Sequence, residues 1–310
     1  MREQKAKKIL DSIGKVIMGK DEVISLSLLT LLSRGHLLLE DVPGVGKTTL
    51  AKTLAATLGC GFSRIQFTPD TLPSDITGVS VYHMEKGEFE YVPGAIMNNI
   101  VLADEINRTS PKTQSSLLEA MEEGQVSVDG KTYPLPSPFM VIATQNPVDY
   151  LGTYHLPEAQ MDRFLMKLSV GYPSGQDEMR MVKAFLEDES WKKVEAVTDA
   201  AEIIEMQKCV EQIFVHDDVV SYALEIIDKT RKNEMITLGA SPRASLALLR
   251  AAQAKAYVEG RDFVTPDDII YLQKPVLSHR LVLSPEAGIN RTGADKVLAS
   301  IRCSVRVPVL

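Results

Sequence analysis

The sequence predicts an α/β domain with a parallel sheet at residues 1–172, followed by an all-helical domain at residues 173–310. Up to about residue 172, short apolar runs of strand length alternate with helical patterns, as in a parallel sheet covered on both faces. From YPSG (172–175) onward the chain shows helical patterns and few strand-like runs. The 310 residues suffice for one large or two modest domains.

Within residues 1–172, predicted strands and predicted helices alternate along the chain. Residues 1–35 predict two helices with a break near Gly14 to Gly19. Strands are predicted at the short apolar runs HLLLE (36–40), RIQF (64–67), IVLAD (100–104) and FMVIAT (139–144). Further helices are predicted at TTLAKTLAATLG (48–59) and after Ser110 and Pro111, which suit an N-cap and a first helical position. In VSVDGKTY (126–133), alternation around an Asp-Gly pair predicts a hairpin.

The second region carries helix signals of the same kind. Helices are predicted at 216–233, 241–260 and 265–277. Ser241 suits a cap, Pro242 a first helical position and Gly260 a stop, while Thr265 with the aspartates that follow suits a helix N-terminus.

Composition argues against some classes of function without excluding them. The net charge of -7 argues against non-specific nucleic-acid binding, which depends on neutralising phosphates. The three cysteines, Cys60, Cys209 and Cys303, lie far apart and predict reduced thiols rather than disulfides or a zinc site. The N-terminus lacks an apolar signal-peptide core, and the longest apolar run, VISLSLLTLL (23–32), is about half a membrane span. We therefore expect a cytoplasmic protein without a membrane span.

The stretch DVPGVGKTT (41–49) lies between a predicted strand and a predicted helix, which is the context of a phosphate-binding loop. Gly44 and Gly46 allow the backbone to approach phosphates, Lys47 reaches the terminal phosphates and Thr48 can ligate magnesium. Asp41 stands where the general pattern G-x-x-x-x-G-K-[ST] begins with glycine. We interpret Asp41 as a tolerated variation at the start of a working loop.

Two carboxylates, Asp104 and Glu105, follow the buried strand IVLAD, where they are costly unless they serve a function. In nucleotide hydrolysis the first holds the magnesium shell and the second polarises the attacking water. Asn146 follows the next strand and suits either an Asn-Pro turn or a water-orienting role.

Two arginines are less specific. Arg163 suits a surface charge paired with Asp162 or Glu158. Arg243 lies in a first helical turn, where a cation opposes the helix dipole, so it suits an anionic ligand or an exposed charge.

Taken together, these residues resemble the AAA+ ATPases and, more narrowly, the MoxR family. The resemblance covers most of the chain. It is carried by LPSDITGVSVY, GEFEYVPG, IVLADEINRTSPKTQSSLLEAMEEGQVSVDG, PFMVIATQNP and GTYHLPEAQMDRF, in that order.

The resemblance implies an AAA+ P-loop NTPase core, a helical lid and a role for each motif. It assigns ATP contacts to the Walker A residues Pro43, Gly44, Val45, Gly46, Lys47, Thr48 and Thr49 and to Asp104, and adenine packing to Val16, Ile17 and Gly19. Mg²⁺ is assigned to Thr48 and Asp104, and catalysis to Lys47, Glu105 (Walker B), Asn146 (sensor 1) and Arg163. Arg163 matches the arginine finger, which reaches the neighbouring subunit's ATP, and Arg243 matches sensor 2, which contacts nucleotide in its own subunit.

The resemblance also implies a hexameric ring that remodels partner complexes, often together with a von Willebrand factor A domain protein. The segment at 79–92 alternates around Lys86-Gly87 and suits a hairpin that interrupts a helix. This segment and the hairpin at 126–133 resemble insertions of the helix-2-insert clade. Phe89 and Tyr91 share one strand face and suit either client contact or packing. Three other functions stay open: the ATPase subunit of a metal chelatase, a nucleic-acid motor of the same clade and a nucleotide-gated scaffold that barely hydrolyses ATP.

Overall fold

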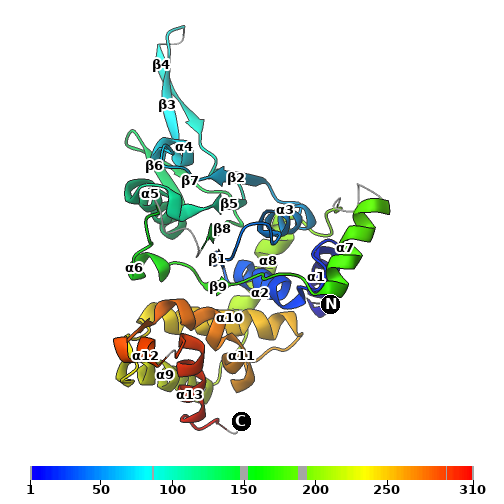
Figure 1. Ribbon diagram of the computed structural model, residues 1–310. Helices are drawn as coiled ribbons and strands as arrows, with labels where there is room; N and C mark the ends of the chain where they lie inside the picture. The colour runs from blue at the N-terminus through cyan, green and yellow to red at the C-terminus, as the bar shows by residue number, and fades with distance from the viewer. Residues whose placement is uncertain (1, 86, 147–152, 188–193, 291, 309–310) are drawn as a thin grey trace.

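The protein consists of an α/β layer and a layer of helices, with two β-hairpins rising from the former (Figure 1). The computed structural model describes residues 2–85, 87–146, 153–187, 194–290 and 292–308. The longer hairpin, residues 78–93, projects at the top of the view in Figure 1. The helix at 175–187 stands at the right of the same view.

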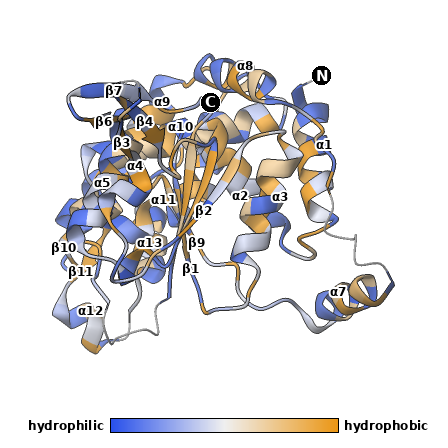
Figure 2. Ribbon diagram, turned by 90° about the horizontal axis from the view of Figure 1, so that it is seen from above, coloured by the Kyte–Doolittle hydropathy of each residue, from blue (hydrophilic) through white to orange (hydrophobic). Residues whose placement is uncertain are grey.

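Among the described residues, the central sheet has five strands in the order β2-β5-β8-β1-β9, and each neighbouring pair is parallel. The strands are β1 (Leu37–Glu40), β2 (Phe62–Gln66), β5 (Ile100–Asp104), β8 (Met140–Gln145) and β9 (Met166–Leu168). Strands β1, β5 and β8 are buried almost throughout, as expected for strands covered on both faces, and Figure 2 shows the hydrophobic colour of the sheet. The predicted α/β class with a parallel sheet is confirmed. Strand β9 adds to the predicted strands, because three residues are too short to give a pattern.

The helices agree with the predicted alternation and with the predicted helical second region. They are α1 (Arg2–Gly14), α2 (Asp21–Leu32), α3 (Lys47–Thr57), α4 (Pro73–Thr77), α5 (Pro111–Glu123), α6 (Glu158–Met161), α7 (Gly175–Glu187), α8 (Ala200–Glu211), α9 (Asp217–Lys232), α10 (Pro242–Val258), α11 (Pro266–Leu277), α12 (Pro285–Ile289) and α13 (Ala294–Cys303), with 3₁₀ turns at Ile106–Arg108 and Ser278–Arg280. The predicted caps are confirmed, since the hydroxyls of Ser110 and Ser241 accept hydrogen bonds from the N–H groups of Thr113 and Ala244.

The helical layer and the α/β layer share one hydrophobic core. Helix α2 is apolar on nearly every face, and it is buried because it packs against α1, α8, α10 and β9. The core cluster accordingly contains residues from both sides of the predicted boundary. The helical region also holds a short antiparallel pair, β10 (Ile236–Leu238) with β11 (Val282–Leu283). Placing the domain boundary near residue 172 stays a prediction. No helix in the described part of the chain is both long and apolar enough to cross a bilayer.

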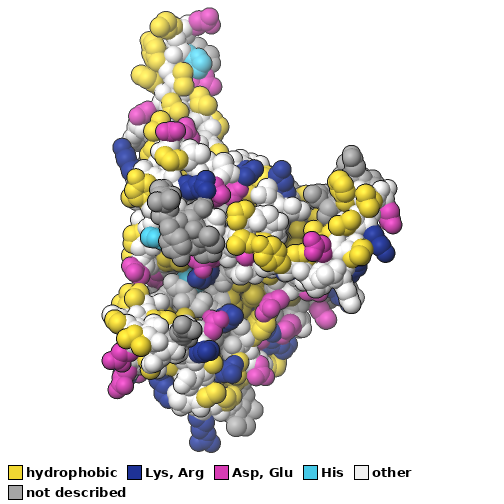
Figure 3. Space-filling view, viewed as in Figure 1, with side chains coloured by type: hydrophobic (Ala, Val, Ile, Leu, Met, Phe, Trp, Pro, Cys, Tyr) yellow, Lys and Arg dark blue, Asp and Glu magenta, His cyan; other side chains and the backbone are white. Residues whose placement is uncertain are grey.

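Both predicted hairpins form, β3 (Gly78–His83) with β4 (Glu88–Pro93) and β6 (Gln125–Val128) with β7 (Lys131–Pro134). Lys86, about which the alternation was expected to turn, lies outside the described residues. The ring of Tyr91 stacks on that of Tyr133 with centroids 3.9 Å apart, so Tyr91 ties the two hairpins together. Phe89 is 66% exposed beside Tyr82. Figure 3 shows hydrophobic side chains along this projecting hairpin. The two residues therefore differ: Tyr91 packs against the other hairpin, whereas Phe89 is exposed and available for contact with a client.

Buried His36 makes the fold sensitive to acid. Its Nδ1 accepts a hydrogen bond from the backbone N–H of Val141 (3.0 Å), and its Nε2 donates to the carbonyl of Met121 (3.1 Å). Burial lowers the pKa of His36 from 6.5 to about 4. The unfolded chain therefore takes up this proton first as the pH falls.

From this shift we expect His36 to destabilise the fold by about 2 kcal/mol at pH 5 relative to pH 7.5. The loss begins as the pH falls below about 6.5 and is complete near pH 4, because the folded pKa lies below the unfolded one. Urea unfolding of the wild type and of His36→Gln, measured at both pH values, tests this. The variant should lose that part of the pH dependence, and an unchanged pH dependence would contradict the expectation.

Candidate active site

Polar side chains gather at the carboxyl ends of the parallel strands. Because β1, β5 and β8 run in the same direction, the residues that follow them share one edge of the sheet. A cavity of about 380 Å³ opens at this edge. Its lining comprises Pro43, Gly44, Gly46, Lys47, Thr48, Thr49, Arg64, Gln66, Asp104, Glu105 and Asn146. The structure thus brings together the glycine loop, the acidic pair and Asn146, which come from three separate parts of the sequence.

The glycine loop has the geometry of an anion cradle. Gly44 and Gly46 have φ values of +88° and +92°, which favour glycine, and a Cβ atom added to either would meet nothing within 4 Å. Gly46 is the N-cap of α3, so the N-terminal N–H groups and the positive end of that helix face the loop. An anion approaching here meets backbone donors with no side chain in the way.

Lys47 is held by the loop itself. Its Nζ donates to the carbonyl oxygens of Asp41 (2.6 Å) and Val42 (3.3 Å). Burial lowers the pKa of Lys47, while the negative charges of Asp41, Asp104 and Glu105 oppose that shift. The ammonium group therefore lies in the cavity lining, bonded to carbonyls that a phosphate oxygen can replace.

The two carboxylates are fixed by neighbours on both adjacent strands. Asp104 Oδ1 accepts from the hydroxyl of Thr144 on β8 (2.6 Å), and its Oδ2 accepts from Arg64 on β2 (2.6 Å). Glu105 has a φ of 60°, a costly left-handed conformation for a residue with a side chain. Its Oε2 accepts from Gln66 Nε2 (3.0 Å) on β2. The strained turn aims Glu105 into the cavity while Asp104 stays at the strand end.

The residues fit a magnesium ion that arrives with a phosphate ligand. The Thr48 hydroxyl and the Asp104 carboxylate line the same cavity, and Mg²⁺ prefers oxygen ligands, few of them from protein. Within the described ranges, no group of three or more His, Cys, Asp or Glu side chains can hold a metal by itself. Such an ion would therefore depend on the nucleotide for part of its coordination.

A second cavity of about 380 Å³ adjoins the first across the loop, sharing Gly44, Gly46 and Thr49. Its lining adds Val16, Ile17, Met18, Lys20, Val45, Val170, Tyr172, Pro173, Glu178 and Met181. These mostly apolar residues suit a planar base, as predicted for Val16 and Ile17. Gly19 does not line this cavity. It packs instead so closely on Asp177 at the start of α7 that a Cβ atom would clash.

Asp41 makes structural contacts that its interpretation as a tolerated variation does not include. The carboxylate is buried, and its Oδ2 accepts from the Ser169 hydroxyl (2.9 Å) and from the N–H groups of Val170 and Gly171 (2.5 and 2.9 Å). It therefore fastens the start of the phosphate loop to the segment that carries Val170 into the second cavity. A glycine, as in the general pattern, would leave these donors without this acceptor.

We expect Asp41→Gly, which restores the general loop pattern, to weaken ATP binding about tenfold and to lower stability by about 2 kcal/mol, because buried donors lose their acceptor. Calorimetric titration with ATP and a denaturant melt measure the two effects. Asp41→Asn keeps one side-chain oxygen and should lie between the two proteins. Binding by Asp41→Gly as tight as that of the wild type would show that the fastening is dispensable.

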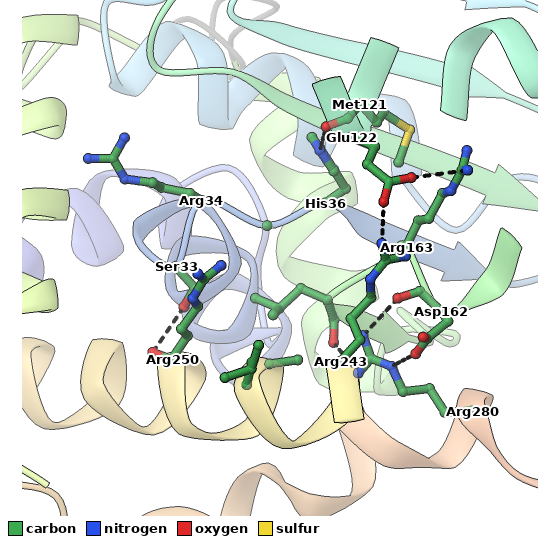
Figure 4. Close-up of a pocket in the computed structure, with 14 residues that line it drawn as sticks. Ser33, Arg34, His36, Met121, Glu122, Asp162, Arg163, Arg243, Arg250 and Arg280 are labelled. Atoms are coloured by element: carbon green, nitrogen blue, oxygen red, sulfur yellow. Dashed lines mark hydrogen bonds and ion pairs between the residues drawn. The ribbon is translucent and has the colours of Figure 1, made fainter. Parts of the chain in front are cut away.

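Arg163 and Arg243 lie together, outside both cavities described above. They meet at Glu122 in a separate cavity of about 270 Å³ (Figure 4). Arg163 therefore pairs with Glu122, whereas Asp162 pairs with Arg280. Arg243 lines neither cavity at the phosphate loop, because its helix presents it to Glu122. The expected contact of Arg243 with nucleotide in its own subunit stays a prediction.

Sequence reasoning missed several residues of the site. Arg64, Gln66 and Thr144 hold the acidic pair, and Glu122 holds the two arginines. Gln66 on β2 sits in register with Asp104 on β5 at the edge of the sheet, so the alternation of polar and apolar residues in RIQF was the available signal for Gln66. No sequence pattern indicated the role of Glu122, since its two arginine partners are distant in the chain.

Comparison with known proteins agrees with this geometry. Residues 36–166 match the family described as ATPase family associated with various cellular activities (AAA), and residues 228–301 match an AAA lid domain. The uncharacterized protein YeaC of Bacillus subtilis is 52% identical over 97% of this chain and 94% of its own. Chaperone MoxR1 of Mycobacterium tuberculosis is 42% identical over 96% of this chain and 80% of its own.

A solved structure extends the likeness to three dimensions. A crystal structure of a protein from Cytophaga hutchinsonii, named as an ATPase candidate, superimposes with a TM-score of 0.93 at 37% identity. The match covers 99% of this chain and 96% of that one. With an AAA core, an AAA lid and near full-length similarity to a MoxR protein, this chain belongs to the MoxR family of AAA ATPases.

Proposed function

We propose that this protein hydrolyses Mg-ATP at sites shared between neighbouring subunits of a ring. The observation that carries the proposal is the cavity at the carboxyl edge of the sheet, where Lys47, Thr48, Asp104, Glu105 and Asn146 converge on a glycine loop. Membership of the AAA family supports ATP as the ligand. The adjoining apolar cavity supports a nucleotide rather than a simple phosphate.

Each side chain has a defined task in this proposal. Lys47 leaves the carbonyls of Asp41 and Val42 and binds the terminal phosphates. Glu105 polarises the attacking water, with Gln66 holding its carboxylate, and Asn146 orients that water against the γ-phosphate. Thr48 and Asp104 would hold Mg²⁺, which supplies positive charge to the transferring phosphoryl group.

The two arginines are proposed to act in the neighbouring subunit's site. Arg163 is the arginine finger, and the pairing of Arg243 with the same Glu122 supports delivery of both to one nucleotide. This proposal differs from the own-subunit contact that the resemblance implies for Arg243. An arginine supplied in trans requires head-to-tail contacts, and such interfaces form rings when the rotation between subunits closes. We propose that the ring contains six subunits.

We further propose that the ring remodels partner proteins in the cytoplasm. The likeness to a relative named a chaperone supports this role, and Phe89 on the projecting hairpin offers a contact for a client. A von Willebrand factor A domain protein is the proposed partner class.

Steady-state phosphate release from ATP, with and without Mg²⁺, tests the proposed function. We expect turnover that requires Mg²⁺ and that rises per subunit with protein concentration as rings assemble. ATP binding without turnover would favour a nucleotide-gated scaffold instead. Turnover stimulated by DNA in a salt-dependent manner would favour a nucleic-acid motor, and stimulation by a chelatase partner would favour a chelatase subunit.

A further inference from the structure

One carboxylate binds both arginines of the proposed interface. Glu122 Oε2 pairs with Arg163 at 3.0 Å, and its Oε1 accepts a hydrogen bond from Arg243 (Figure 4). The three side chains come from different elements: the last turn of α5, the segment after α6 and the first turn of α10. Two guanidinium groups repel each other, so their joint position depends on the anion between them.

The backbones that carry the two arginines are also tied together. Asp162, next to Arg163, accepts from the hydroxyl of Ser241, the N-cap of α10 (2.8 Å), and from Arg280 Nε (2.7 Å). The buried Arg280 donates as well to the carbonyl of Phe164 (2.7 Å). The base of each arginine is therefore fixed by Asp162, and the tips are joined by Glu122.

Stability does not explain this pairing. The exposed side-chain fractions are 29% for Arg163, 45% for Arg243 and 37% for Glu122, and ion pairs this exposed add little to folding. The carboxylate also lies in the last turn of α5, where the helix dipole disfavours it. Each guanidinium has five N–H donors and uses one nitrogen for Glu122, so donors are left for a second anion. The arrangement thus presents two cations side by side.

We propose that Glu122 is a positioning residue for ATP hydrolysis, aligning Arg163 and Arg243 as a pair for the nucleotide of the neighbouring subunit. This inference rests on the proposed function, because it requires the arginines to act in trans. Glu122 acts through the arginines and does not touch the nucleotide. Its loss should therefore lower kcat in the neighbouring site and leave ATP binding in its own site unchanged.

The first test compares Glu122→Gln with Glu123→Gln, which makes the same change of charge one residue along the same helix. We expect Glu122→Gln to lower kcat about tenfold to a hundredfold through misplaced arginines, with the Kd for ATP within about twofold of wild type. Glu123→Gln should match the wild type, and both variants should melt at similar temperatures. Activity of Glu122→Gln equal to or above that of the wild type would overturn the proposal, since Glu122 would then restrain the arginines.

The second test mixes subunits under conditions where rings exchange. Glu122→Gln subunits mixed with Lys47→Ala subunits should regain activity, because the latter supply a correctly aligned pair to an intact phosphate loop. A Lys47→Ala/Glu122→Gln double variant should not restore it. As a parallel check of the proposed function, Arg163→Ala subunits are mixed with Lys47→Ala subunits.

The outcomes separate the two proposals. Rescue of Arg163→Ala without rescue of Glu122→Gln overturns the role of Glu122 and leaves the shared site standing. If neither variant is rescued, the in-trans role of Arg163 is contradicted. The proposed role of Glu122 is then contradicted as well, because it depends on that arginine. Rescue of both, with no rescue by the double variant, is the result expected here.

Discussion

Replacing Glu105 by glutamine is expected to leave ATP binding within about twofold of wild type and to lower turnover by a hundredfold or more, about the contribution of a positioned general base. Glutamine keeps the size of the side chain and can still contact Gln66, but it cannot accept a proton from water. The strained φ of 60° at this position supports a functional role for the side chain. Single-turnover and steady-state phosphate release, together with ATP titration, measure the two effects.

The Glu123→Gln variant is the matched control for Glu105→Gln as well, since Glu123 is exposed and lies outside the cavity. It should hydrolyse ATP at the wild-type rate. Near-normal turnover by Glu105→Gln would remove Glu105 from the proposed chemistry and would leave the phosphate loop as a binding site only.

Arg163→Ala is expected to lower turnover by about a thousandfold, the effect typical of a missing arginine finger. Each subunit should still bind ATP, because Arg163 lines neither of the cavities at the phosphate loop. Arg302→Ala, on helix α13 of the helical region, serves as the control for loss of an arginine elsewhere. Equal losses of ATP affinity and turnover in Arg163→Ala would place the arginine in the site of its own subunit.

The sequence predicted those parts of the site whose chemistry is local. Gly44, Gly46, Lys47 and Thr48 follow one another, and their left-handed glycines and helix start are dictated by neighbours in the chain. Asp104 and Asn146 could be predicted because buried parallel strands are recognised in the sequence as apolar runs. The carboxyl ends of such strands lie at one edge of the sheet, so the residues that follow them lie close together.

The side-chain partners that lie far apart in the sequence could not be predicted from it. The contacts of Asp41 could not be predicted because its donors, Ser169 to Gly171, lie about 130 residues away, at the end of a strand too short to predict. The pairing of Arg243 with Glu122 could not be predicted for the same reason: its helix was predicted correctly, but the orientation of that helix depends on the Asp162 contact. Patterns specify elements well, whereas the pairing of distant side chains depends on how the elements pack.

If one ATP site is built from two subunits, mixing Arg163→Ala subunits with Lys47→Ala subunits should restore hydrolysis. Neither variant should hydrolyse ATP alone. In exchanged rings, a Lys47→Ala subunit can offer its arginines to the intact loop of an Arg163→Ala subunit, so activity should reappear and peak at intermediate mixing ratios. If rings exchange subunits and no activity reappears at any ratio, the shared site is contradicted.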